Sequence, residues 1–181
     1  DFASEINKEA LRLRDIVGDI IELSSLDEGY KGENEEINVR NAVESEIKKL
    51  EHKAKDSCVS IENGVSSSLL INGIPKVFSE VISNLLDNAI RYNKKGGWVK
   101  VESKGLGEKI EISVSDNGIG IPKDSIERIF ERFYRGDTSH NSQKAGYGIG
   151  LSMAEELTKL MDGKINVSYK AQRITFTVRL G

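Results

Sequence analysis

The chain has 181 residues, and its 26 Lys and Arg against 29 Asp and Glu give a net charge of −3. Such a mildly acidic chain lacks the cationic surface that non-specific nucleic-acid binding needs, so we expect no nucleic-acid partner. One Cys excludes an internal disulfide and a Cys-rich zinc cluster, and two His argue against a His-based metal site. No apolar run approaches the roughly 20 residues of a membrane span. Because the sequence opens with Asp1, we expect a piece of a longer protein.

Residues 2–26 are predicted to form one long amphipathic helix. Their apolar side chains recur mostly every third or fourth residue, which makes a single stripe. Nothing local covers this stripe, so the favoured interpretation is packing on a helix of another molecule or of a missing segment. The alternative is that the stripe folds back on this chain. Residues 29–36 are polar and contain Gly, which indicates a boundary and divides the chain into residues 1–28 and 29–181.

The second part alternates short strand and helix patterns. Helices are predicted at residues 40–55, 75–92 and 148–161, a short helix at 124–131, and strands at 36–39, 58–62, 67–72, 98–103, 109–115, 164–169 and 173–180. Asn63-Gly64 predicts a hairpin between the second and third strands. Pro75 suits a first helical position, and Gly163 suits the residue that follows a helix. The predicted class is α/β (α+β), a two-layer sandwich of helices on a mixed, mostly antiparallel sheet, preceded by the long N-terminal helix.

A polar row interrupts the otherwise ordinary helix at residues 75–92. Glu80, Asn84, Asn88 and Tyr92 are four residues apart and share one side. Asn is a poor helix former, so two Asn residues on one row suggest that this side of the helix holds something polar. A solvated face with incidental Asn residues explains the same pattern.

Two glycine-rich segments follow. Asp116-Asn117-Gly118-Ile119-Gly120 comes directly after a strand and allows close approach of backbone to a ligand, although an ordinary capped turn has the same composition. Gly146-Tyr147-Gly148-Ile149-Gly150-Leu151 opens a helix, where free N–H groups favour anions. It is neither a dinucleotide fingerprint nor a P-loop. The polar residues 139–144 before it are predicted to form a lid, beside three aromatics in residues 129–135.

Together these motifs resemble the ATP-binding domain of sensor histidine kinases, in the class shared with gyrase, HSP90 and MutL. The match covers about residues 36–180, and residues 19–27 look like the end of the second helix of the kinase dimerisation hairpin. The resemblance implies that Asn88 binds Mg²⁺, with Asn84 one turn earlier on the same wall. It implies that Arg91 reaches the phosphates, that Tyr92 packs on adenine and that Asp116 accepts from the adenine amino group.

The remaining implied nucleotide contacts lie in the two glycine segments. They are Gly118, Gly120 and Ile121 in the first, and Gly146, Tyr147, Gly148, Gly150 and Leu151 in the second, with Lys144 adding charge beside the lid. Asn84, Asn88 and Arg91 form the implied catalytic set. Glu80 either supports the metal shell or is merely exposed. ATPases of the class have a water-activating Glu at the position of Asn84, and Asn cannot act as a base, which favours transfer to a protein over hydrolysis.

The resemblance implies transfer of the ATP γ-phosphoryl group to a histidine, for relay to a response-regulator aspartate. The acceptor histidine of the family lies on the first hairpin helix, which is absent here, and neither His52 nor His140 has its context. We therefore expect a catalytic fragment that binds Mg·ATP and does not phosphorylate itself. The parent is expected to be a membrane-anchored homodimer with this domain in the cytoplasm. An ATPase or clamp of the same fold and a degenerate binding module are the alternatives.

Overall fold

The computed structural model describes residues 32–107, 109–134 and 148–181, together with residues 6, 7, 10 and 17. The predicted N-terminal helix at residues 2–26 and the predicted lid at 139–144 therefore lie almost entirely outside the described residues. The same holds for Lys144, Gly146 and Tyr147. The fold below is that of the described part.

A five-stranded sheet forms one layer of the molecule. In sheet order its strands are β2 (Ser60–Gly64), β4 (Trp98–Leu106), β5 (Lys109–Asp116), β7 (Arg173–Leu180) and β6 (Lys164–Lys170). Only the β2–β4 pair is parallel; the other three pairs are antiparallel. The sheet is thus mixed and mostly antiparallel, as predicted.

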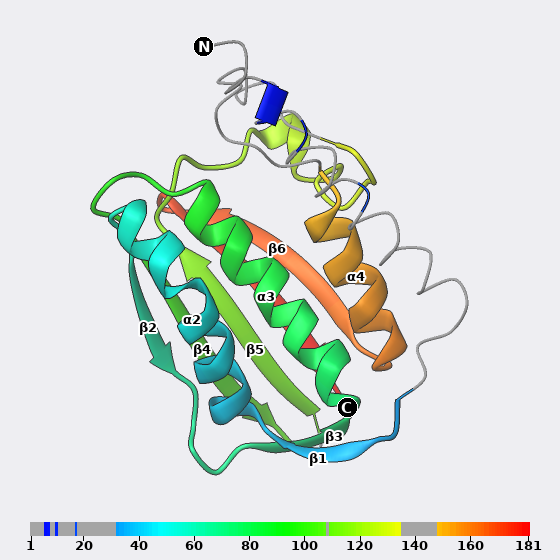
Figure 1. The fold of residues 1–181 in the computed structure, drawn as a ribbon. Helices are drawn as coiled ribbons and strands as arrows, with labels where there is room; N and C mark the ends of the chain where they lie inside the picture. Colours follow the sequence, from blue (N-terminus) through cyan, green and yellow to red (C-terminus); the bar gives the residue numbers. More distant parts are fainter. Residues whose placement is uncertain (1–5, 8–9, 11–16, 18–31, 108, 135–147) are drawn as a thin grey trace.

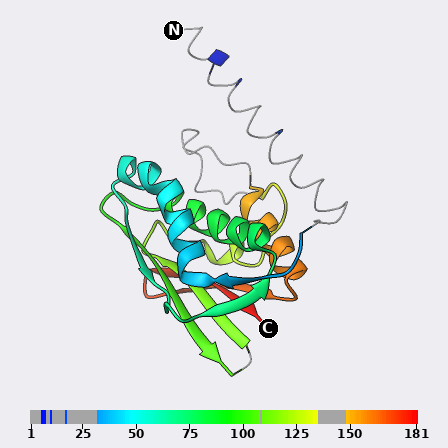
Figure 2. The ribbon, with the colours of Figure 1, turned by 60° about the horizontal axis from the view of Figure 1, so that its bottom comes forward.

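Three helices form the second layer and cover one face of the sheet (Figure 1). They are α2 (Val39–Asp56), α3 (Pro75–Arg91) and α4 (Gly150–Leu160). The central helix α3 packs against both α2 and α4. Seen after rotation, the helices and the sheet remain two separate layers (Figure 2). The two-layer architecture is therefore confirmed.

A second, small sheet pairs β1 (Glu35–Asn38) with β3 (Leu70–Gly73) in antiparallel fashion. It lies at the end of the molecule where α2 and α3 begin (Figure 1). Both helices start as sequence rules suggest: the Asn38 side chain accepts a hydrogen bond from the Asn41 N–H, and Pro75 occupies the first helical turn.

The core lies between the layers and follows the pleat of the strands. On β5, Ile112 and Val114 are fully buried, and on β7 Phe176 and Val178 join them. The alternate residues face away from the helices, where Glu111 and its cross-strand neighbour Arg179 form an ion pair of 2.8 Å. This parity matters for the site, because Asp116 continues the inward row of β5.

Three local predictions are wrong. Asn63-Gly64 does not turn a hairpin, because β2 pairs with β4 and β3 pairs with β1. Residues 124–131 hold only a 3₁₀ turn at Lys123–Ser125 followed by further turns. After α4, Asp162 rather than Gly163 takes the left-handed conformation (φ 52°), while Gly163 lies where a Cβ would stand 2.5 Å from Leu180. The glycine is needed there for packing, not for its backbone freedom.

Candidate functional site

The polar row of α3 borders the start of α4. Glu80, Asn84, Asn88 and Tyr92 are all half-buried. Asn84 Nδ2 donates to the carbonyl of Glu80 at 3.0 Å, which turns its Oδ1 toward α4. A Cβ on Gly150 would stand 3.0 Å from that oxygen. The first turn of α4 therefore packs so closely on the row that a side chain at residue 150 would press on the Asn84 amide.

Asn88 lies one turn further along the same face. Its backbone carbonyl accepts the N–H of Tyr92, which ends the helix. Within the described part of the chain, its side-chain amide has no hydrogen-bond partner. A half-buried, uncommitted amide oxygen on the same helix face as Asn84 can serve as a ligand for a hard cation.

Asp116 is the most deeply buried carboxyl of the predicted site, with 2% of the residue exposed. It ends β5 on the inward-facing row, so its carboxylate replaces an apolar side chain at the edge of the core. Burial raises its pKa from 3.8 to about 6, and the hydrogen bond from the Gly118 N–H (2.8 Å) opposes part of that rise. Among the described residues this is the only hydrogen bond of its carboxylate, and none of them donates to the second oxygen.

The loop after Asp116 folds onto the end of α3. Ile119 N–H donates to the carbonyl of Tyr92 at 3.0 Å. A Cβ on Gly118 would stand 2.4 Å from that same carbonyl and 2.8 Å from Asp116 Oδ1. Gly118 therefore permits a contact that no other residue would allow, and it sets Asp116 beside Tyr92.

Two further asparagines hold the Asp116 loop against the end of α3. Neither was predicted to have a role. Asn93 is buried, and its Nδ2 donates to the carbonyls of Ala89 and Trp98, both at 3.1 Å. Asn117 Oδ1 accepts the Trp98 N–H at 2.8 Å. Asn93 directly follows Tyr92, and Asn117 directly follows Asp116. An Asn directly after each proposed binding residue was the sequence signal that could have indicated these roles.

A second close contact, between residues 133–134 and Gly148, fixes the chain directly before α4. Phe133 N–H donates to the carbonyl of Gly148 at 2.9 Å. Gly148 has φ +71°, and a Cβ there would stand 2.5 Å from the carbonyl oxygen of Tyr134. Tyr134 itself is held by a 2.9 Å hydrogen bond to Ser125 and by the guanidinium of Arg128, 4.3 Å above its ring. The aromatic segment thus supports the start of the helix.

The N-terminus of α4 has no side-chain cap: Ile149 occupies the N-cap position and is buried. No acidic residue occupies the first turn. The first amides of this helix are consequently not satisfied by a cap, and the positive end of the helix dipole faces the Asn84 side of α3.

Arg91 is not free at the site. Its Nη2 donates to Asp87 Oδ2 at 2.8 Å, one turn earlier on α3, and Lys53 of α2 pairs with the other oxygen, Oδ1. The predicted role for Arg91 did not include these partners.

The remaining predicted contact residues belong to the Asp116 loop, the end of α3 and the start of α4. Ile121 and Leu151 are half-buried and pack on the core, Tyr92 is half-buried, and Gly120 (φ +87°) lies where a Cβ would stand 2.7 Å from Tyr169 Oη. Tyr169 of β6 is a neighbour that the sequence analysis missed. The structure therefore brings α3, the Asp116 loop and the start of α4 together. It leaves Lys144, Gly146 and Tyr147 undescribed.

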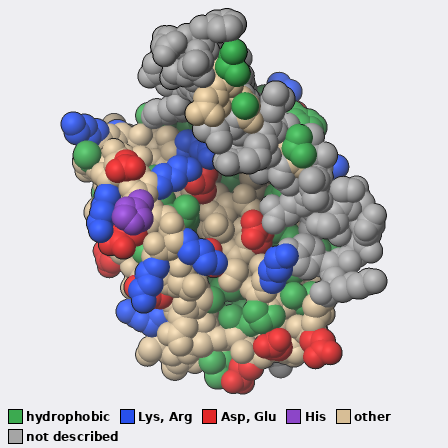
Figure 3. Space-filling view, in the orientation of Figure 1, with side chains coloured by type: hydrophobic (Ala, Val, Ile, Leu, Met, Phe, Trp, Pro, Cys, Tyr) green, Lys and Arg blue, Asp and Glu red, His purple; other side chains and the backbone are tan. Residues whose placement is uncertain are grey.

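Two general features of the described residues bear on the site. They contain no cluster of three His, Cys, Asp or Glu side chains fit to hold a metal ion. None of their helices is long and apolar enough to span a membrane. On the face shown in Figure 3, Lys and Arg side chains gather along the side formed by α2, next to α3.

Comparisons with known proteins agree with the fold and identify its family. The family described as histidine kinase-, DNA gyrase B- and HSP90-like ATPase matches residues 73–181, which hold α3, the Asp116 loop and α4. The sensor-like histidine kinase SenX3 of Mycobacterium tuberculosis is 34% identical over 181 residues, covering 99% of this chain and 44% of the relative. The sensor histidine kinase WalK of Bacillus subtilis is 30% identical over 183 residues, covering 98% of this chain and 30% of its own length. The chain thus spans less than half the length of these relatives.

Solved structures share the fold at low identity. The histidine kinase AdeS of Acinetobacter baumannii gives a TM-score of 0.79 at 22% identity, covering 99% of this chain and 83% of that one. The catalytic domain of the histidine kinase ThkA gives 0.72 at 23% identity, covering 82% of this chain and 95% of that one. Full-length ShkA, solved with AMPPNP, gives 0.81 at 23% identity, covering 93% of this chain and 35% of that one.

Proposed function

The chain belongs to the family of histidine kinase-, DNA gyrase B- and HSP90-like ATPases, and on that premise we propose that it is the ATP-binding catalytic part of a sensor histidine kinase. In this proposal it binds Mg·ATP and transfers the γ-phosphoryl group to a histidine on a dimerisation hairpin. The similarity to SenX3 and WalK over nearly the whole chain supports a kinase rather than another member of the family.

The observation that carries the proposal is the buried carboxylate of Asp116. A carboxylate with one hydrogen bond, from Gly118, retains an acceptor oxygen at the edge of the core. Leaving it unsatisfied is costly, and a ligand amine relieves that cost. The adenine amino group is such a donor. Tyr92, beside Gly118, offers an aromatic ring on which the base stacks.

The phosphates are assigned to the place where the polar row of α3 meets the start of α4. The uncapped first turn of α4 supplies N–H groups and the positive end of its dipole. Asn88 offers an amide oxygen for Mg²⁺, whose other ligands are phosphate oxygens and water. When bound, Mg²⁺ supplies positive charge to the β- and γ-phosphate oxygens. Lys144, Gly146 and Tyr147, which the structure does not describe, keep their proposed places at the phosphates.

Asn84 favours transfer to a protein over hydrolysis. Its amide cannot accept a proton as a general base, and its Nδ2 is already committed to the Glu80 carbonyl. The acceptor imidazole brings its own nitrogen nucleophile. A bond forms from that nitrogen to the γ-phosphorus as the bond to the bridging oxygen breaks, and ADP leaves.

Residues 1–28 are proposed to be the second helix of the dimerisation hairpin. The parent protein is then a homodimer, anchored in the membrane with this part in the cytoplasm. It passes the phosphoryl group to a response-regulator aspartate. His52, exposed on α2, is not proposed as an acceptor.

The test is a transfer assay with radiolabelled ATP and Mg²⁺. The isolated acceptor hairpin of a related kinase, and its His→Ala variant, are added to this chain. Acid-labile, base-stable label on the wild-type hairpin alone supports the proposal. Release of free phosphate at the same rate with or without the hairpin supports an ATPase instead, and neither product supports a non-catalytic module.

A further inference from the structure

A charged cluster joins α2 to α3 beside the polar row. Asp87 binds two cations at once: Arg91 on its own helix, through Oδ2, and Lys53 on α2, through Oδ1. The side chains are only 27% and 40% exposed for Arg91 and Lys53, and 26% for Asp87. Neither Lys53 nor Asp87 belongs to the residues assigned to the nucleotide above.

The helix geometry places this cluster at the border of the proposed site. Consecutive residues of an α-helix are about 100° apart, so Asp87 and Asn88 face different neighbours. Asp87 faces Lys53 on α2, while Asn88 shares its face with Asn84, which lies against Gly150 of α4. Arg91 follows Asp87 by four residues and Asn88 by three, and it can reach either side.

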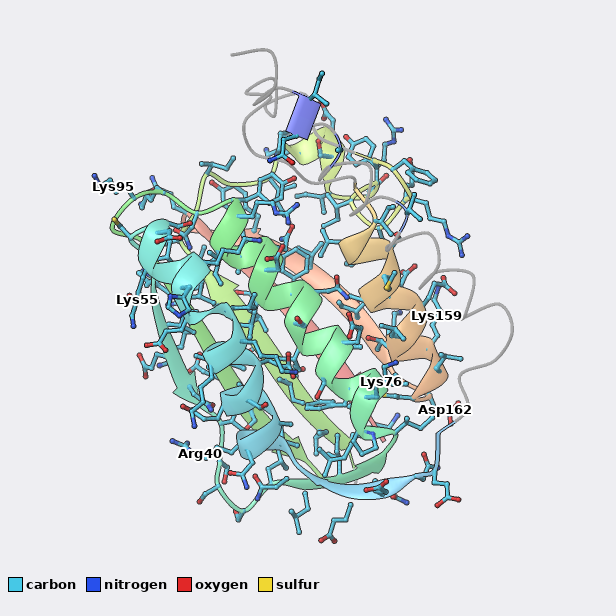
Figure 4. The ribbon with its side chains drawn as sticks, viewed as in Figure 1. Arg40, Lys55, Lys76, Lys95, Lys159 and Asp162 are labelled. Carbon is cyan, nitrogen blue, oxygen red and sulfur yellow. The ribbon has the colours of Figure 1, made fainter. Side chains whose placement is uncertain are left out.

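The cluster also carries a surplus of charge. Two cations and one carboxylate leave a net charge of +1, and Lys53 and Arg91 lie in the last turns of their helices. In Figure 4, Lys55 marks the end of α2 and Lys95 follows the end of α3, so the two helices end on the same side. Without Lys53, Asp87 and Arg91 would form a neutral pair.

We propose that Lys53 and Asp87 are positioning residues that set Arg91 for the nucleotide phosphates. Asp87 anchors the guanidinium at the border between α2 and the polar row. Lys53 pairs with one oxygen of the carboxylate, and its charge leaves the cluster with a net charge of +1 for the phosphates. The inference rests on the proposed function, because it requires the phosphates to lie at the Asn88 side of α3.

The test compares ADP with adenosine by calorimetric titration of the whole chain, since the two ligands share the base and differ in the phosphates. We expect Lys53→Met to weaken ADP about fivefold and to leave adenosine unchanged, with the loss shrinking at high salt. Lys53→Arg should restore ADP binding. Lys55→Met is the matched control, because Lys55 pairs with Glu51 on its own helix and points away from α3 (Figure 4).

The Asp87→Asn variant distinguishes two explanations of ADP affinity: positioning of Arg91 and the net charge of the cluster. This change removes the negative charge of the cluster, which raises its net charge, and it removes the carboxylate that anchors Arg91. Positioning predicts weaker ADP binding despite the higher net charge, whereas a simple electrostatic effect predicts tighter binding.

Three results would overturn the inference while leaving the proposed function intact: ADP affinity of Lys53→Met within twofold of wild type, an equal loss for ADP and adenosine, or tighter ADP binding by Asp87→Asn. Failure of the folded wild type to bind either ligand would instead refute the proposed function, and the inference with it.

Discussion

Asp116, which we propose as the adenine-binding carboxylate, opposes the stability of its own fold. Its carboxylate lies in the row of buried apolar side chains of β5, and burial raises its pKa to about 6. A raised pKa in the folded state means that ionisation destabilises the fold. The cost is fully present above about pH 6 and is relieved as the pH falls toward the unfolded pKa.

Replacing this carboxylate should therefore stabilise the ligand-free chain. We expect Asp116→Asn to raise the free energy of unfolding by about 1–2 kcal/mol at pH 7.5, because the amide carries no charge and still accepts from Gly118. The gain should disappear near pH 4. Urea unfolding of both proteins across this range measures it; a variant less stable than wild type at pH 7.5 would refute the assigned cost.

Nucleotide binding should depend on the same ionisation in the opposite sense. The ionised carboxylate is the stronger acceptor for the adenine amino group, so affinity for ADP should fall as the pH drops below about 6. The fluorescence of Trp98, the single Trp, can follow this titration, because the backbone of Trp98 is hydrogen-bonded to the side chains of Asn93 and Asn117 beside the loop. Equal pH profiles for wild type and Asp116→Asn would exclude this role.

At the residue scale, sequence reasoning located Asp116 and the Asn84–Asn88 row but not their partners. Asp116 follows a strand whose alternation can be read from the sequence. The ion pairs of Arg91 could not be read, because Lys53 is 34 residues away from Asp87 and meets it only after α2 and α3 have packed.

At the scale of elements, the site depends on two close helix and loop approaches. Asn84 meets Gly150 between α3 and α4, and Tyr92 meets Gly118 at the end of α3. At Gly118 a Cβ would collide with the Tyr92 carbonyl, and at Gly150 it would press on the Asn84 amide. We propose that each approach holds one part of the ligand.

Gly150→Ala should separate binding from stability. Ala is favoured over Gly in a helix by up to about 1 kcal/mol, so the thermal midpoint should stay or rise. The new Cβ, 3.0 Å from Asn84 Oδ1, should displace that amide and the phosphates, weakening AMPPNP binding about tenfold. Calorimetry and thermal unfolding measure the two effects. Unchanged affinity would show that the α3–α4 approach does not serve the ligand.

Gly118→Ala should instead damage the fold locally. The Cβ would stand 2.4 Å from the backbone carbonyl of Tyr92, which cannot move aside as a side chain does. We expect a loss of about 2 kcal/mol or more in the free energy of unfolding. Gly105→Ala on β4 is the control, since nothing lies within 4 Å of its Cβ. Similar losses for both variants would mean that the Tyr92 contact is not the cause.

The elements themselves were largely predictable, because their hydrophobic periods are strong. Pairing was not. Asn63-Gly64 has the composition of a hairpin turn, yet β2 crosses over to lie parallel to β4. Such a partner is chosen by packing of distant segments, and local turn chemistry carries no information about it.

For the whole molecule, the described part of the chain carries the proposed nucleotide site, and the proposed acceptor lies elsewhere. Residues 1–28 are proposed to supply one helix of a dimerisation hairpin, and their apolar stripe predicts weak self-association. Sedimentation equilibrium should show a mass that rises with concentration and returns to the monomer after deletion of residues 1–28. A monomer mass at every concentration would contradict this proposal.

We propose that the Asp116 loop, α3 and the start of α4 form an Mg·ATP site. The most direct measurement is calorimetric titration with AMPPNP, with and without Mg²⁺, on wild type and Asp116→Ala. The account predicts binding by the wild type that strengthens with Mg²⁺ and is lost in the variant while the fold is retained. Equal binding by a folded Asp116→Ala, or none by the folded wild type, would contradict it.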